Sequence, residues 1–134
     1  MVKQSRVFDI RIVPPYTFNQ YVENIKVEEN KDSYVILNLP KTSIVTFGIL
    51  SDVDCILKFY ISYDGKTWYP YCIVNRKVTL DFVLDEAKPL QLALSANKPI
   101  TYVLDFPLKA KFLKIETDTL TGKIQMEIAS DAVW

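Results

Sequence analysis

Apolar and polar residues alternate with a period of two along most of this chain. The alternation is clearest in residues 55–63, where Leu57, Phe59 and Ile61 share one parity and Lys58 and Tyr60 share the other. Successive side chains of an extended strand point to opposite sides, so this pattern predicts a strand with one buried face. No segment has a convincing helical period. Similar runs cover residues 8–12, 21–27, 34–39, 44–50, 67–74, 78–82, 90–94, 100–106, 111–117 and 124–128.

Short segments rich in charged residues, Pro and Gly separate these runs, including residues 14–15, 28–33, 85–89, 97–99 and 118–122. The predicted strands recur roughly every 8–12 residues, which is typical of a sandwich. A flat sheet of that many strands would leave one face wet and its edges bare. We therefore expect one all-β domain over residues 1–134, a two-sheet antiparallel β-sandwich of about nine or ten strands with jelly-roll or Greek-key connectivity.

Asp64 and Gly65 follow the clearest strand, and Asp-Gly is a strong signal for a two-residue type I′ hairpin turn. Such a turn would pair Tyr63 with Lys66 and place Trp68 opposite Ile61, on the core face. Further along, the same register pairs Phe59 with Pro70 and Leu57 with Cys72. The opposite face would then gather Lys58, Tyr60, Tyr69 and Tyr71.

This predicted tyrosine face has two interpretations. Exposed rings on a flat sheet would suit sugar stacking or protein contact. Alternatively, Tyr60, Tyr69 and Tyr71 pack across the strands beneath a loop or a neighbouring strand, which we favour. Cys55 and Cys72 would share the core face, and we expect two buried free thiols rather than a disulfide.

The overall charge is balanced, with 16 basic and 16 acidic residues. Such a chain has no long-range field to attract phosphate, so we expect neither nucleic acid nor an anionic membrane as a partner. No apolar run approaches the roughly 20 residues of a membrane span, and charges interrupt the first twelve residues, unlike a signal peptide. We therefore expect the protein to begin in the cytosol.

Histidine is absent, which removes the commonest general base and the commonest metal ligand. The three glycines, Gly48, Gly65 and Gly122, cannot form a Gly-rich phosphate loop. We therefore expect no cofactor and no enzymatic activity.

The acidic residues offer two weaker candidates. Asp52, Asp54 and Asp64 could supply oxygen ligands to Ca²⁺ at a rim, although a solvated acidic turn is the favoured interpretation. A hydrolase would need two opposed carboxylates. Nothing in the sequence selects a pair from Asp81, Asp85, Glu86 and Asp105.

The segment IVTFGILSDVDCILKFYISYDGKTW carries an S-x-D-G-x-x-W hairpin after an apolar strand and an Asp-containing turn. A later A-K-F-L-K-I strand begins at Ala110 and includes Phe112 and Lys114. Together these segments resemble β-sandwich structural proteins of phages and archaeal viruses. They have a weaker resemblance to discoidin-like (coagulation factor 5/8 type C) modules, whose N-terminal tryptophan region this chain lacks.

The viral resemblance implies a non-enzymatic virion structural or accessory protein that contacts copies of itself or other virion proteins. It also implies a location in the virion or in the host cytoplasm. Trp134 at the C-terminus would either insert into a neighbouring subunit or cap its own core. The alternative function is a carbohydrate-binding module that uses the tyrosine face. A jelly-roll hydrolase is a third and weaker hypothesis.

Overall fold

The computed structural model describes residues 7–13, 25–39, 44–78, 83–105, 110–119 and 121–130. All regular structure in these residues is β-strand, as predicted, and none of them forms a helix that could cross a membrane. The described residues form twelve strands, which are β1 (Phe8–Ile12), β2 (Lys26–Asn30), β3 (Tyr34–Asn38), β4 (Ile44–Ser51), β5 (Cys55–Ser62), β6 (Tyr69–Pro70), β7 (Cys72–Val78), β8 (Val83–Pro89), β9 (Gln91–Leu94), β10 (Ile100–Asp105), β11 (Phe112–Thr117) and β12 (Ile124–Ser130).

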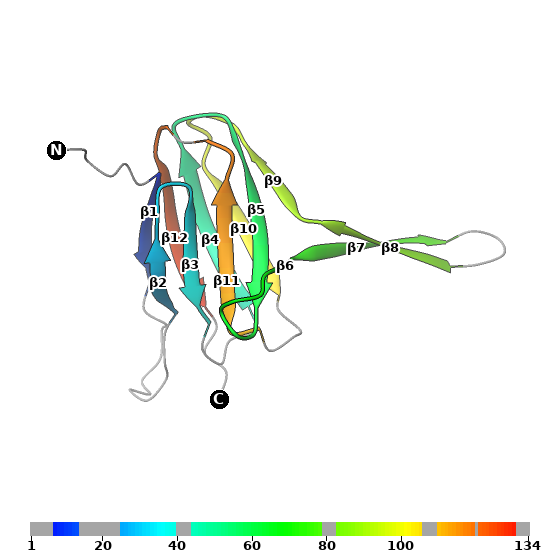
Figure 1. The fold of residues 1–134 in the computed structure, drawn as a ribbon. Coiled ribbons are helices and arrows are strands. Elements are labelled where there is room, and N and C mark those ends of the chain that lie inside the picture. Colours follow the sequence, from blue (N-terminus) through cyan, green and yellow to red (C-terminus); the bar gives the residue numbers. More distant parts are fainter. Residues whose placement is uncertain are drawn as a thin grey trace.

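Two sheets pack face to face, which confirms the predicted β-sandwich (Figure 1). The first sheet has the order β1-β12-β4-β10. The second has the order β2-β3-β11-β5-β6, and β9 also pairs with β5. From β3 onward the chain repeatedly crosses between the sheets, which is how a jelly roll is wound. All the described strand pairs are antiparallel except that of β1 and β12, which run parallel.

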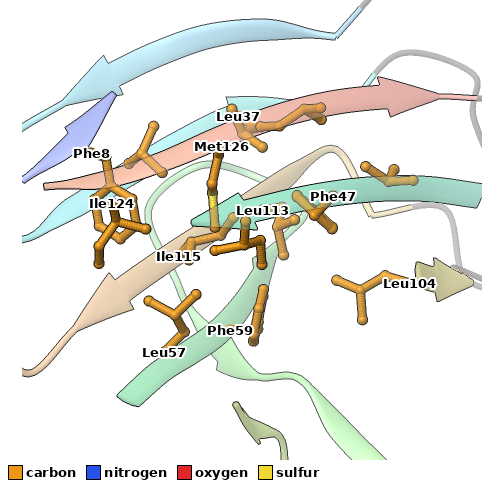
Figure 2. Close-up of a cluster of buried hydrophobic side chains, with 14 of the residues drawn as sticks. Phe8, Leu37, Phe47, Leu57, Phe59, Leu104, Leu113, Ile115, Ile124 and Met126 are labelled. Carbon is orange, nitrogen blue, oxygen red and sulfur yellow. The ribbon is translucent and has the colours of Figure 1, made fainter. Parts of the chain in front are cut away.

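The core lies between the sheets and is formed mainly by the buried parity of β3, β4, β5, β11 and β12, with single side chains from β1, β9 and β10 (Figure 2). On β5 the side chains of Cys55, Leu57 and Phe59 are buried, whereas Lys58 is exposed. The Phe59 ring lies 6.3 Å from the Phe47 ring of the opposite sheet, measured between ring centroids. The alternation therefore predicted correctly which side of the central strand faces inward.

The Asp-Gly turn differs from the prediction. β5 pairs Ile61 with Tyr69 and Tyr60 with Pro70, so the register is one residue away from the predicted one. Gly65 has a φ of 80°, but Asp64 is not in the positive-φ region that a type I′ turn requires. The strands are instead joined by a longer loop, residues 63–68, the Asp64 loop.

The Asp64 carboxylate explains this longer loop. Its Oδ1 accepts hydrogen bonds from the backbone N–H groups of Lys66 at 2.8 Å and Thr67 at 2.9 Å, and from the Ser62 hydroxyl at 3.1 Å. Aspartate side chains commonly organise turns in this way. The backbone hydrogen bonds from Thr67 and Lys66, and the bond from Ser62, lower the pKa of Asp64 from 3.8 to about 2.

The predicted return strand, residues 67–74, is divided in the structure. β6 has only two residues, and Pro70 has no N–H to donate to β5. One further hydrogen bond, from Tyr71 N to Phe59 O at 2.8 Å, ends the contact with β5. β7 then leaves the sandwich and pairs with β8 in a separate two-stranded ribbon, which projects to one side (Figure 1).

Two segments that we predicted as turns lie in strands. Residues 85–89 belong to β8. Glu28 and Glu29, which we assigned to a charged turn, lie in β2, where the register opposite β3 shifts between Val27 and Glu29. The predicted strand at 78–82 begins at Val78, the last residue of β7, and its remaining residues lie outside the described ranges.

Candidate functional site

Aromatic rings gather around one lysine on the outer face of the second sheet. The Lys114 ammonium nitrogen lies 4.8 Å from the ring centroid of Tyr34, 5.6 Å from that of Trp68 and 5.9 Å from that of Tyr60. These distances are within the range of a cation–π interaction. The four residues are called the Lys114 cluster below.

Strand alternation positions three members of the cluster. On β11, Leu113 and Ile115 are buried in the core, so Lys114 between them points outward. Lys114 pairs with Tyr60 of β5 on one side and with Ile36 of β3 on the other. Tyr34 lies two residues before Ile36 on β3 and therefore faces the same way.

The Asp64 loop supplies the fourth member, Trp68. The loop folds over the start of β11 (Figure 1), where a Cβ added to Gly65 would lie 3.3 Å from the Phe112 ring. The positive φ of Gly65 and this close approach both favour glycine. Trp68 is half-buried on the outer face, so its predicted place in the core is wrong. The one-residue register difference explains the error, because it reverses which side each residue faces.

Charged groups near the cluster balance one another. The Lys114 side chain is only 22% exposed, and its nitrogen lies 3.9 Å from Glu116 Oε2. Nearby, Lys31 in the turn between β2 and β3 lies 3.8 Å from Oε1 of Glu29 on β2. Burial raises the pKa of Tyr34, and the nearby Glu29 carboxylate raises it further.

An open hollow of about 450 Å³ lies beside the cluster, between β2 and the Asp64 loop. Aromatic, aliphatic and charged groups all contribute to its walls. The lining residues are Glu28, Glu29, Lys31, Ile36, Gly65, Trp68 and Phe112.

The structure separates the residues of the predicted tyrosine face. Lys58 and Tyr60 do share the outer face of β5. Tyr69 is 52% exposed but pairs with the inward-facing Ile61, and Tyr71 packs against the core. The proposed binding role of these residues stays a prediction, but they do not form one continuous surface. Trp134 lies outside the described residues.

The three aspartates proposed as weak metal ligands each hold a turn. Asp52 Oδ1 accepts a hydrogen bond from Lys123 N at 2.7 Å, and Asp54 Oδ1 accepts one from Ala96 N at 2.7 Å. Asp64 organises its own loop. Across the ranges that the structure describes, no three His, Cys, Asp or Glu side chains come close enough to hold a metal ion.

Of the four acids considered for a hydrolase, Asp85 and Glu86 lie in β8 and Asp105 lies at the end of β10. Asp81 lies outside the described residues, and for Asp85, Glu86 and Asp105 only the backbone is described. Both cysteines are free thiols, as expected. Cys55 is buried, but Cys72 is exposed rather than buried, because β7 leaves the sandwich at that residue.

The β7–β8 ribbon is a second candidate surface. Seven residue pairs join the two strands, from Cys72 opposite Pro89 to Val78 opposite Val83. Its base is fastened to the sandwich by a hydrogen bond from Leu90 N to Tyr71 O at 2.8 Å. Among the described strands, no third strand pairs with it.

Sequence reasoning missed the part played by Tyr34, Phe112 and Lys114. A signal was present, because β3 and β11 both carry aromatic residues at the parity opposite to their buried leucines and isoleucines. Searches against protein-family models, curated proteins and solved structures found no match for this chain.

Proposed function

We propose that this chain is a non-enzymatic structural or accessory protein of a virus particle that assembles with copies of itself through the β7–β8 ribbon. The observation that carries the proposal is the course of the ribbon, which leaves the two-sheet sandwich and extends beyond it (Figure 1). The viral setting is supported by the resemblance of the hairpin and A-K-F-L-K-I segments described above.

A two-stranded ribbon is a weak unit by itself. Isolated hairpins are marginally stable in water, and the outer edges of such a pair present backbone N–H and C=O groups that can accept another strand. Over seven pairs the ribbon is roughly 20 Å long. A strand from a second copy would complete its backbone hydrogen bonds and bury its surface, as in other β-strand additions.

The charge balance supports close approach of identical chains. With 16 basic and 16 acidic residues, two copies have no net repulsion to overcome. Proteins near zero net charge associate more readily than highly charged ones. A self-associating ribbon is therefore compatible with the electrostatics of the whole chain.

A ribbon deletion provides the test. Because Cys72 and Pro89 are direct partners, residues 73–88 can be replaced by an Asn-Gly turn that joins them. The bonds from Tyr71 N to Phe59 O and from Leu90 N to Tyr71 O remain available to hold the base.

Light scattering coupled to size exclusion should find oligomers of the wild type and monomers of the deletion variant, with similar melting temperatures. Measurements should extend to about 1 mM, so that only very weak association is missed. A wild type that stays strictly monomeric over this range would refute assembly through the ribbon.

A further inference from the structure

We propose that the hollow beside the Lys114 cluster is a binding site for a neutral carbohydrate. The inference goes beyond assembly and uses a different part of the molecule from the ribbon. It also places glycan binding on residues other than the predicted tyrosine face, since Tyr69 and Tyr71 do not line this hollow.

The apolar part of the hollow suits the C–H face of a sugar ring. Ile36 lies on β3, and the aromatic rings of Trp68 and Phe112 add flat apolar surface beside it. Aromatic rings with one polar edge are well suited to ligands that are apolar on one face and polar at the rim. The volume of about 450 Å³ falls within the range of small-molecule sites.

The polar part of the hollow comes from an irregularity in β2. Neighbouring residues of a regular strand point to opposite sides, yet Glu28 and Glu29 both line the hollow. The register shift between Val27 and Glu29 accounts for this, because a β-bulge redirects a side chain. Two carboxylates thus lie where they can accept hydrogen bonds from sugar hydroxyls, and hydrogen bonds to ionised acceptors are the stronger kind.

Several contacts fix these groups before a ligand arrives. Asn38 Nδ2 donates a hydrogen bond of 2.7 Å to Glu28 Oε1, and Lys31 lies 3.8 Å from Glu29. The Trp68 ring rests against Lys114, and Asp64 holds the backbone of the loop that carries it. Groups that are already ordered lose less entropy on binding, which favours affinity.

The charges of the hollow select against ionic ligands. A phosphate or sulfate group would meet the carboxylates of Glu28 and Glu29. A cationic ligand would meet Lys31, which lies beside Glu29 and offsets its charge. The two aromatic rings of the hollow already face lysines, Trp68 facing Lys114 and Phe112 facing Lys111. Like charges placed against a ligand provide specificity by repulsion. A neutral polyol encounters no such repulsion and finds hydrogen-bond acceptors and donors together.

The first experiment is a glycan array probed with the labelled wild-type protein, followed by titration of each hit by calorimetry. We expect binding to neutral glycans, and Trp68→Ala should weaken it at least about tenfold, as for an aromatic anchor. Tyr69→Ala is the matched control, because Tyr69 is exposed and does not line the hollow. Its affinity should equal that of the wild type.

A second variant covers the case in which Trp68→Ala disturbs the fold. Glu29→Gln keeps the shape of the side chain, removes its charge and should weaken binding without changing the melting temperature. The ribbon deletion should bind glycans as the wild type does, so failure of assembly and failure of glycan binding are distinguishable. The proposal is overturned if no arrayed glycan binds, if only anionic or cationic glycans bind, or if a folded Trp68→Ala variant binds with unchanged affinity.

Discussion

Replacing Gly122 by alanine should destabilise the sandwich, whereas the same replacement at Gly48 should not. Gly122 has a φ of 87°, and a Cβ added there would lie 2.5 Å from Asp52 Oδ1 and 2.8 Å from Val53 Cγ1. Gly48 lies in β4, where the nearest side-chain atom to an added Cβ is Glu127 Cβ at 3.9 Å, an ordinary contact. The two variants add the same methyl group to opposite environments.

The expected loss at Gly122 has two parts. A non-glycine residue in the left-handed region costs about 1–2 kcal/mol. The clash also displaces the Asp52 carboxylate, which accepts the 2.7 Å hydrogen bond from Lys123 N, and an exposed bond of this kind contributes about 1–2 kcal/mol. The free energy of unfolding should therefore fall by about 2–4 kcal/mol. Alanine at Gly48 should raise it by about 0.5 kcal/mol, since glycine inside a strand is unfavourable.

Thermal unfolding followed by circular dichroism measures this difference. At about 2.1 cal/mol/K of unfolding entropy per residue, a 134-residue chain loses roughly 7–14 °C of melting temperature for 2–4 kcal/mol. Urea titration at fixed temperature should give the same ranking of the variants. A Gly122→Ala variant as stable as the wild type would refute the assignment of Asp52 as a structural turn residue. A Gly48→Ala variant that loses as much stability as Gly122→Ala would refute the claim that the surroundings of the added methyl group decide the effect.

Two further predictions concern the Asp64 loop and the cysteines. The pKa of Asp64 is lowered to about 2 in the folded protein, so its stabilising effect is complete above the ordinary pKa of 3.8 and disappears as the pH falls through about 2. Between those pH values the melting temperature of the wild type should fall more than that of Asp64→Ala. Parallel curves of melting temperature against pH would contradict the hydrogen-bond assignment. Cys72 is exposed and Cys55 is buried, so a thiol reagent should modify Cys72 of the native protein quickly and Cys55 only after unfolding. Mass spectrometry counts the modified cysteines, and rapid modification of both would contradict the burial of Cys55.

The sandwich could be predicted because the alternation is a local property of each strand. In β5, the parity of Leu57, Phe59 and Ile61 was sufficient to assign the buried face, and the structure agrees. The same reasoning failed at Trp68, where everything depended on the length of one loop. A carboxylate that binds two backbone N–H groups added residues to the turn and shifted the register by one.

The ribbon could not be predicted for a different reason. The sequence indicates a strand at the start of β7, but in β8 the Asp, Glu, Ala, Lys and Pro of residues 85–89 indicate a turn, because these residue types are depleted in strands. Whether a strand joins a sheet or leaves it depends on which distant backbone groups are available to pair. After Pro70 the only further bond to β5 in this segment is the one from Tyr71 N, and β7 pairs with β8 instead of with β5.

The hollow and the β7–β8 ribbon are close in sequence, but a segment bonded to β5 lies between them. Trp68 precedes β6, and the ribbon begins directly after Tyr71, so only three residues lie between the aromatic wall of the hollow and the base of the ribbon. Those residues are the ones fastened to β5, by the pairing of Tyr69 with Ile61 and by the bond from Tyr71 N to Phe59 O. These bonds hold the segment between Trp68 and the ribbon on β5. Assembly would therefore leave the hollow intact and repeat it on every subunit, so that weak binding to one glycan becomes strong binding to a glycan-covered surface.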